Sequence, residues 1–191
     1  LRHPTPIAKQ VATIDLLTEG RFIFGVGVGG EFAKEYEACG VPRNERGARL
    51  SEGIGVLRKF WSGESVSNHG KFYPFEDVRM TPPPAQPGGP PIWCGGRATA
   101  ALQRAGRIGD GWFSYAITPQ MYRDGLAVIA DAAHAAGRDF ATFGTAHLLF
   151  ARVSDNAEQA LDEAAEHLSI RYGVDMRKAT KTRVEIIEDA T

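Results

Sequence analysis

Cysteine is scarce in this sequence, with only Cys39 and Cys94 among 191 residues. The two lie far apart, without the paired spacing of zinc ligands, so the sequence predicts neither a disulfide framework nor a zinc site. We therefore expect a reducing, cytoplasmic setting. The sequence also has no apolar run near the roughly 20 residues that cross a bilayer, and Leu1 to Pro4 do not resemble a signal peptide. No membrane association is expected.

An excess of charge of one sign is also absent. The 22 basic and 23 acidic residues give a formal net charge of -1 and are interspersed, so no surface for a nucleic acid is expected. The five histidines lack the spacing of metal ligands, and no nucleophilic triad can be proposed from residue order. The sequence thus predicts no metal site and leaves the catalytic residues unassigned.

What the sequence does contain is an alternation of strand-like and helix-like segments. Four apolar segments have the composition of strands in a parallel sheet: residues 21–28, 92–94, 111–115 and 147–153. Helices are predicted from Thr5-Pro6 to Gly20, through Glu35 and Tyr36, over about 44–61, 98–107 and 118–137, and from a capping box at Asp155 and Glu158. This order predicts an α/β fold with a parallel sheet and crossover helices.

Four strands are half of the eight that close a (β/α)8 barrel, which usually needs roughly 250 residues. We therefore expect residues 1–191 to form a single, incomplete barrel domain, truncated at both ends. Residues 63–91 interrupt the alternation, because aromatic residues surround Asn68-His69-Gly70 and a proline-rich stretch follows. A hairpin with an extended return is predicted there.

Ligands of parallel α/β proteins gather at the carboxyl ends of the strands. After the first strand, residues 25–30 match the dinucleotide-binding pattern G-x-G-x-x-G. These glycines lie within the apolar run, however, and no full helix and second strand follow at the required distance. Small residues that make room for side chains in a barrel interior are the favoured interpretation. Farther on, Arg46, Arg49 and Glu52 are interpreted as a row of salt bridges along one helix.

The residues after the second strand are Gly95, Gly96, Arg97, Ala98 and Thr99. The two glycines allow a ligand close to the backbone, the helix start offers free N–H groups, and Arg97 and Thr99 add a charge and a hydroxyl. This combination suits a phosphate. Taken alone, a tight strand-to-helix turn without a ligand explains the same residues equally well.

Several segments, taken in order, resemble the bacterial luciferase-like flavin-dependent oxidoreductases. The similar stretches are residues 6–15, 20–22 and 25–29, the residues Arg46, Arg49, Glu52, Leu57, Arg58 and Trp61, and residues 70–73, 91–96 and 109–112. They span most of residues 1–150, and no single motif carries the resemblance.

The resemblance implies a TIM barrel in which the four strands are the fourth to seventh and residues 63–91 are the family's insertion. It implies that coenzyme F-420 or FMN binds across the carboxyl ends of the strands, with its phosphate at Gly95, Gly96, Arg97, Ala98 and Thr99. The residues of the similar segments favour F-420 over FMN. A small organic substrate would undergo hydride transfer or O2-dependent monooxygenation. The full-length protein is expected to form a homo-oligomer.

Two other functions remain open at this point. A phosphosugar-metabolising barrel could use Gly95 and Gly96 in the same way, although the lysines and acids that its chemistry needs at strand ends are not evident. A non-catalytic barrel remnant or binding module is the other, because half a barrel leaves open sheet edges and a divided core. Binding of F-420 or FMN would distinguish the oxidoreductase from both.

Overall fold

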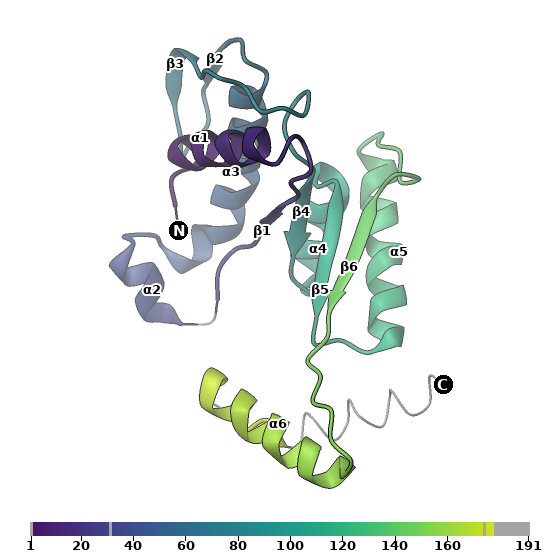
Figure 1. The fold of residues 1–191 in the computed structure, drawn as a ribbon. Coiled ribbons are helices and arrows are strands. Elements are labelled where there is room, and N and C mark those ends of the chain that lie inside the picture. The colour runs from purple at the N-terminus through teal and green to yellow at the C-terminus, as the bar shows by residue number, and fades with distance from the viewer. Residues whose placement is uncertain (1, 31, 174, 178–191) are drawn as a thin grey trace.

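The computed structural model describes residues 2–30, 32–173 and 175–177. The last part of the predicted single domain, residues 178–191, lies outside the described residues. Four strands form a parallel sheet in the order β1-β4-β5-β6 (Figure 1), namely β1 (Phe24–Val26), β4 (Ile92–Gly95), β5 (Gly111–Tyr115) and β6 (Gly144–Leu148). Each strand lies beside the next of the four along the chain, and all pairings are parallel. The predicted α/β fold with four parallel strands is confirmed.

Helices connect and flank these strands. They are α1 (Pro4–Leu17), α2 (Ala33–Ala38), a 3-10 turn η1 (Arg43–Glu45), α3 (Arg46–Trp61), α4 (Thr99–Ile108), α5 (Pro119–Ala135) and α6 (Ala157–Tyr172). The core lies between the helices and one face of the sheet, where Trp61, Ile92, Trp112 and Ile129 are buried. Figure 1 shows α6 apart from the other helices, beyond the carboxyl ends of the strands.

The opposite face of the sheet is open. Trp93 lies across two strands on this face, because a Cβ atom on Gly111 or Gly144 would come within 2.6 Å or 2.3 Å of its ring. Phe113 and Leu148 share the face by strand alternation and are 39% and 41% exposed. The sheet therefore has one face packed against helices and one apolar face that is partly in solvent.

The predicted hairpin between residues 63 and 91 is confirmed. Strands β2 (Ser65–Asn68) and β3 (Phe75–Arg79) pair antiparallel, with a bulge between Val66 and Asn68. The carboxylate of Glu52 on α3 accepts hydrogen bonds from the backbone N–H groups of Phe72 and Tyr73, at 3.1 and 2.8 Å. The buried Asp15 on α1 likewise accepts from the backbone and side-chain nitrogens of Gln86, at 2.8 and 2.7 Å. Two carboxylates thus hold the hairpin and its return against the helices.

The structure corrects two helix starts. Helix α1 begins at Pro4 with His3 as the capping residue, whose Nδ1 accepts from the N–H of Thr5, and not at Thr5-Pro6. Helix α6 is capped by Asn156, whose side chain accepts from the N–H of Gln159, and not by a box at Asp155 and Glu158. Each true cap lies within two residues of the predicted one.

The predicted strand bounds also need correction. The fourth strand covers Gly144–Leu148 and not residues 147–153, because its ladder with β5 starts at Gly111 and ends where Tyr115 faces Leu148. The first strand is likewise shorter than residues 21–28, since β4 offers it partners only for Phe24–Val26. An apolar run in the sequence predicts that a strand is present. The bounds of the strand depend on how many residues of the neighbouring strand can pair with it.

Candidate functional site

The five residues predicted to bind a cofactor phosphate form the turn between β4 and α4. Gly95 ends the strand, and Gly96 adopts a φ angle of +121°, which residues with a side chain rarely adopt. A Cβ atom on Gly96 would lie 2.9 Å from that of Ala101, and one on Gly95 would lie 3.5 Å from the carbonyl oxygen of Val26. The backbone here takes a path that requires glycine at position 96.

The start of α4 has no side-chain cap. Its capping position is Ala98, whereas α1, α5 and α6 are capped by side chains. The N–H of Ala101 donates to the carbonyl oxygen of Ala98 at 2.8 Å, so the N–H groups of Thr99 and Ala100 are those left for another acceptor. The positive end of the helix dipole favours an anion there. Thr99 is exposed beside this turn.

Arg97 and Trp112 connect the turn to β5. The guanidinium of Arg97 donates to the carbonyl oxygen of Ala116 at 3.1 Å and lies 5.9 Å from the ring centre of Tyr115. The indole N–H of Trp112 donates to the carbonyl oxygen of Gly96 at 2.8 Å. The structure thus brings all five predicted residues together, but it directs the Arg97 guanidinium toward the end of β5.

The turn fits a phosphate group by three properties: a glycine where a side chain would collide, free N–H groups at a helix start, and a neighbouring hydroxyl and cation. Whether these residues bind one remains a prediction from the sequence.

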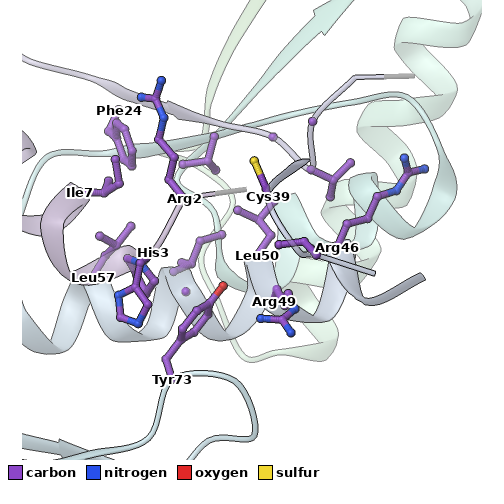
Figure 2. A pocket seen from close by; sticks show the side chains of 18 of the residues that line it. Arg2, His3, Ile7, Phe24, Cys39, Arg46, Arg49, Leu50, Leu57 and Tyr73 are labelled. Carbon is purple, nitrogen blue, oxygen red and sulfur yellow. The ribbon is translucent and has the colours of Figure 1, made fainter. Parts of the chain in front are cut away.

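A cavity of about 590 Å³ lies beside β1, the first strand of the sheet, between α1, α3 and Tyr73 (Figure 2). Its wall includes the apolar side chains Ile7, Leu50, Ile54 and Leu57. Gly25 and Gly27 also line it, and a Cβ atom on either would meet nothing within 4 Å. These glycines therefore border open space that no side chain of the described residues fills.

The polar side chains of this cavity are predominantly cationic. Arg2, His3, Arg46 and Arg49 line it, and no aspartate or glutamate among the residues that the structure describes does. Arg49 forms an ion pair with Glu45 at 2.8 Å, and this hydrogen-bonded contact raises the pKa of its guanidinium. Arg46 lies 5.8 Å from the ring centre of Tyr36. The sequence prediction missed this site because its residues come from positions 2 to 73.

The interpretation of Arg46, Arg49 and Glu52 as a row of salt bridges is wrong. Arg49 pairs with Glu45 one turn earlier, while Glu52 binds backbone N–H groups of the hairpin. The same spacing that allows a row on a helix surface also lets each side chain turn to a different neighbour.

Two further side chains of types that often act in catalysis, Cys94 and Ser114, have structural roles here. Burial raises the pKa of the Cys94 thiol to about 11, so this side chain is not a nucleophile near neutral pH. The hydroxyl of Ser114 lies 2.8 Å from Nδ1 of His147, but Ser114 is completely buried between sheet and helix. A substrate could not reach it.

Metal ligands and membrane spans were also predicted to be absent. Within the part of the chain that the structure describes, no group of three histidine, cysteine, aspartate or glutamate side chains is placed to bind a metal ion. Among the same residues, no helix has the length and apolar character that crossing a membrane requires.

The chain is similar in sequence to known proteins of one family. The profile of the family described as luciferase-like monooxygenase matches residues 1–190. The chain is 36% identical over 162 residues to an F420-dependent hydroxymycolic acid dehydrogenase of Mycobacterium tuberculosis, covering 83% of this chain and 43% of that protein. It is 31% identical over 167 residues to a phthiodiolone/phenolphthiodiolone dimycocerosates ketoreductase of the same species, covering 84% and 43%. The chain spans less than half the length of these relatives.

Solved structures share the fold. The monooxygenase RslO1 of Streptomyces bottropensis superposes with a TM-score of 0.75 at 25% identity, over 96% of this chain and 56% of that one. The F420-dependent tetrahydromethanopterin reductase of Methanopyrus kandleri gives 0.74 at 21% identity, over 98% and 60%. An F420-dependent secondary alcohol dehydrogenase, in complex with an F420-acetone adduct, gives 0.74 at 22% identity, over 83% and 48%. The four-stranded sheet therefore corresponds to part of a TIM barrel of the luciferase-like type.

Proposed function

The chain belongs to the luciferase-like monooxygenase family, and we propose that it is part of an oxidoreductase that uses coenzyme F-420 or FMN. The proposed reaction is hydride transfer or O2-dependent monooxygenation of a small organic substrate. Coenzyme F-420 is favoured, because a relative that is 36% identical is described as F420-dependent.

The observation that carries this proposal is the turn between β4 and α4. In the proposed complex, the free N–H groups at the start of α4 and the hydroxyl of Thr99 bind the cofactor phosphate. Gly96 allows the backbone to approach the phosphate closely, and its carbonyl is oriented by Trp112. Arg97 contributes positive charge from its position beside Ala116. The bound cofactor supplies the redox chemistry, while the protein binds and orients it.

Binding of the cofactor tests the proposal directly. The protein is titrated with F-420 and with FMN while the fluorescence of the cofactor is recorded, and binding of at least one is expected. Absence of binding of both at roughly tens of micromolar would contradict the proposed function.

The position of the phosphate is tested with the variant Thr99→Val, which keeps the shape of the side chain and removes its hydroxyl. Loss of one hydrogen bond of about 1 kcal/mol weakens affinity roughly five-fold. The matched control is Thr142→Val, at an exposed turn position. If the protein binds FMN, riboflavin provides a second control, since it lacks the phosphate and its affinity should be unchanged by Thr99→Val. Equal effects of the substitution on FMN and riboflavin would place the phosphate elsewhere.

A further inference from the structure

We propose that Trp112 is a positioning residue of the phosphate site, because its indole N–H holds the peptide between Gly96 and Arg97 in the orientation that presents the backbone N–H of Arg97 to the phosphate. This inference rests on the proposed function, since it concerns the same turn between β4 and α4. It adds a side chain of the core to a site that otherwise consists of contiguous residues.

A hydrogen bond between the core and the turn carries the inference. The indole N–H of Trp112 donates to the carbonyl oxygen of Gly96 at 2.8 Å. Gly96 lies between β4 and α4, outside both elements, and has a φ angle of +121°. Glycine permits many orientations of the peptide that follows it. The indole therefore selects one orientation of this peptide.

The selected orientation determines where the N–H of Arg97 points. The peptide between Gly96 and Arg97 is trans, and in a trans peptide the carbonyl and the N–H point in opposite directions. Because the carbonyl is directed at the buried Trp112, the N–H of Arg97 points away from the core. It joins the N–H groups of Thr99 and Ala100 as a third backbone donor to a phosphate.

This arrangement gives Arg97 a role that does not depend on its side chain. The guanidinium donates to the carbonyl oxygen of Ala116 at 3.1 Å and lies 5.9 Å from the ring centre of Tyr115. The backbone N–H stays at the turn while the side chain makes these contacts. Arg97 can therefore bind a phosphate at the turn although its guanidinium is directed toward the end of β5.

Helix α5 holds the indole in place. The ring of Trp112 stacks on that of Tyr122, with 5.1 Å between the ring centres and 20° between the planes. A Cβ atom on Gly125 would lie 2.8 Å from the edge of the indole, so glycine leaves the room that the ring needs. Trp112 is only 1% exposed. The hydrogen bond to Gly96 is therefore preorganised before a ligand binds.

Trp61 provides a matched comparison within the same core. It is also 1% exposed, and its indole N–H donates to the carbonyl oxygen of Ala8 at 3.0 Å. Ala8 lies inside α1, however, where the helix itself fixes the direction of the carbonyl. Substitution of Trp61 therefore removes a similar hydrogen bond and similar packing, without releasing a peptide at the phosphate site.

The first experiment uses inorganic phosphate as the probe and needs no cofactor. Phosphate is added to isotope-labelled protein while the backbone amide signals are recorded by NMR. The signals of Arg97, Thr99 and Ala100 are expected to shift and to saturate. In Trp112→Phe the shift of the Arg97 signal should be lost, and the affinity for phosphate should fall roughly five-fold, as expected for one lost hydrogen bond.

The control is Trp61→Phe, which should lose stability in urea unfolding to a similar extent but keep the response of Arg97 to phosphate. Two results would overturn the proposal. One is an Arg97 signal that does not respond to phosphate in the unchanged protein. The other is the same response in Trp112→Phe as in the unchanged protein.

A second replacement separates the hydrogen bond from the packing of the ring, and it also serves if Trp112→Phe does not fold. Benzothienylalanine in place of Trp112 keeps the bicyclic shape and has sulfur where the indole has its N–H. The Arg97 response should again be lost, whereas the same replacement of Trp61 should leave it unchanged. A folded protein that carries the analogue at position 112 and responds normally would contradict the positioning role.

Titration with FMN distinguishes this inference from the proposed function. If neither FMN nor F-420 binds but the phosphate response depends on Trp112, the proposed function fails and the positioning role is supported. If FMN binds equally well to the unchanged protein and to Trp112→Phe, the positioning role fails and the proposed function is supported. The result that supports both is affinity for FMN that is roughly five-fold weaker in Trp112→Phe, with unchanged affinity for riboflavin.

Discussion

Burial separates the two cysteines chemically. Cys94 lies in β4 among core side chains, where loss of hydration disfavours the thiolate and raises the pKa to about 11. Cys39 is exposed at the end of α2. Because the pKa of Cys94 is higher in the folded than in the unfolded protein, its contribution to stability is fully present below about pH 9 and is lost as the pH rises toward 11.

We predict that iodoacetamide at about pH 8 modifies Cys39 and spares Cys94 in the folded protein. After unfolding in urea both thiols should react, which controls for their intrinsic reactivity. Intact-mass and peptide mass spectrometry measure the sites. Equal rates for the two cysteines in the folded protein would show that Cys94 is not protected by the core.

At the scale of secondary-structure elements, the contact between α4 and α5 depends on a glycine. A Cβ atom on Gly106 would lie 2.3 Å from the carbonyl oxygen of Ile129 and 2.9 Å from the Cβ atom of Ala132. The two helices therefore approach more closely than a side chain at this position allows. Gly55, inside α3, is the opposite case, because a Cβ atom there meets nothing within 4 Å.

We predict opposite effects for the same substitution at these two positions. Gly106→Ala should lower the free energy of unfolding by about 2 kcal/mol, because α4 and α5 must move apart. Gly55→Ala should raise it by roughly 0.5–1 kcal/mol, because alanine favours the helix and restricts the unfolded chain. Urea unfolding followed by circular dichroism measures both, and a neutral Gly106→Ala would mean that the helices are less tightly packed.

At the scale of the whole molecule, Asp110 joins distant parts of the chain. Its carboxylate forms ion pairs with Arg58 of α3 at 2.8 Å and with Arg138 after α5 at 3.1 Å, and accepts from the N–H of Ile92 at 2.9 Å. Arg58 and Arg138 each bind a different oxygen of this carboxylate, and they also donate to the carbonyl oxygens of Ile108 and Gly106, respectively.

We predict that Asp110→Asn lowers the free energy of unfolding by about 1–2 kcal/mol, a modest value because the charged groups are partly solvated. The exposed Asp131 on α5 provides the control, and Asp131→Asn should change stability by less than about 0.5 kcal/mol. Thermal or urea unfolding decides the comparison. If the two variants have equal stability, the network around Asp110 contributes nothing.

The order of strands and helices in the whole molecule could be predicted from the sequence, whereas contacts between distant segments could not. Apolar runs and helix periodicity identified the four strands and their crossover helices, because these patterns are local along the chain. The end of β6 was not predictable from the apolar run 147–153, since it depends on where β5 ends at Tyr115. The candidate phosphate site around Gly96 could be predicted because its residues are contiguous in the sequence. The cavity around Arg2 and Tyr73 could not, because it forms only when α1, α3 and the hairpin pack together.

The position of Trp93 has a consequence for observing the protein. Of the three tryptophans, Trp61 and Trp112 are buried in the core, while Trp93 lies across Gly111 and Gly144 on the open face of the sheet. Any molecule that covers this face removes water from one indole only. A shift of tryptophan emission to shorter wavelength would therefore report occupancy of the barrel interior without an added label.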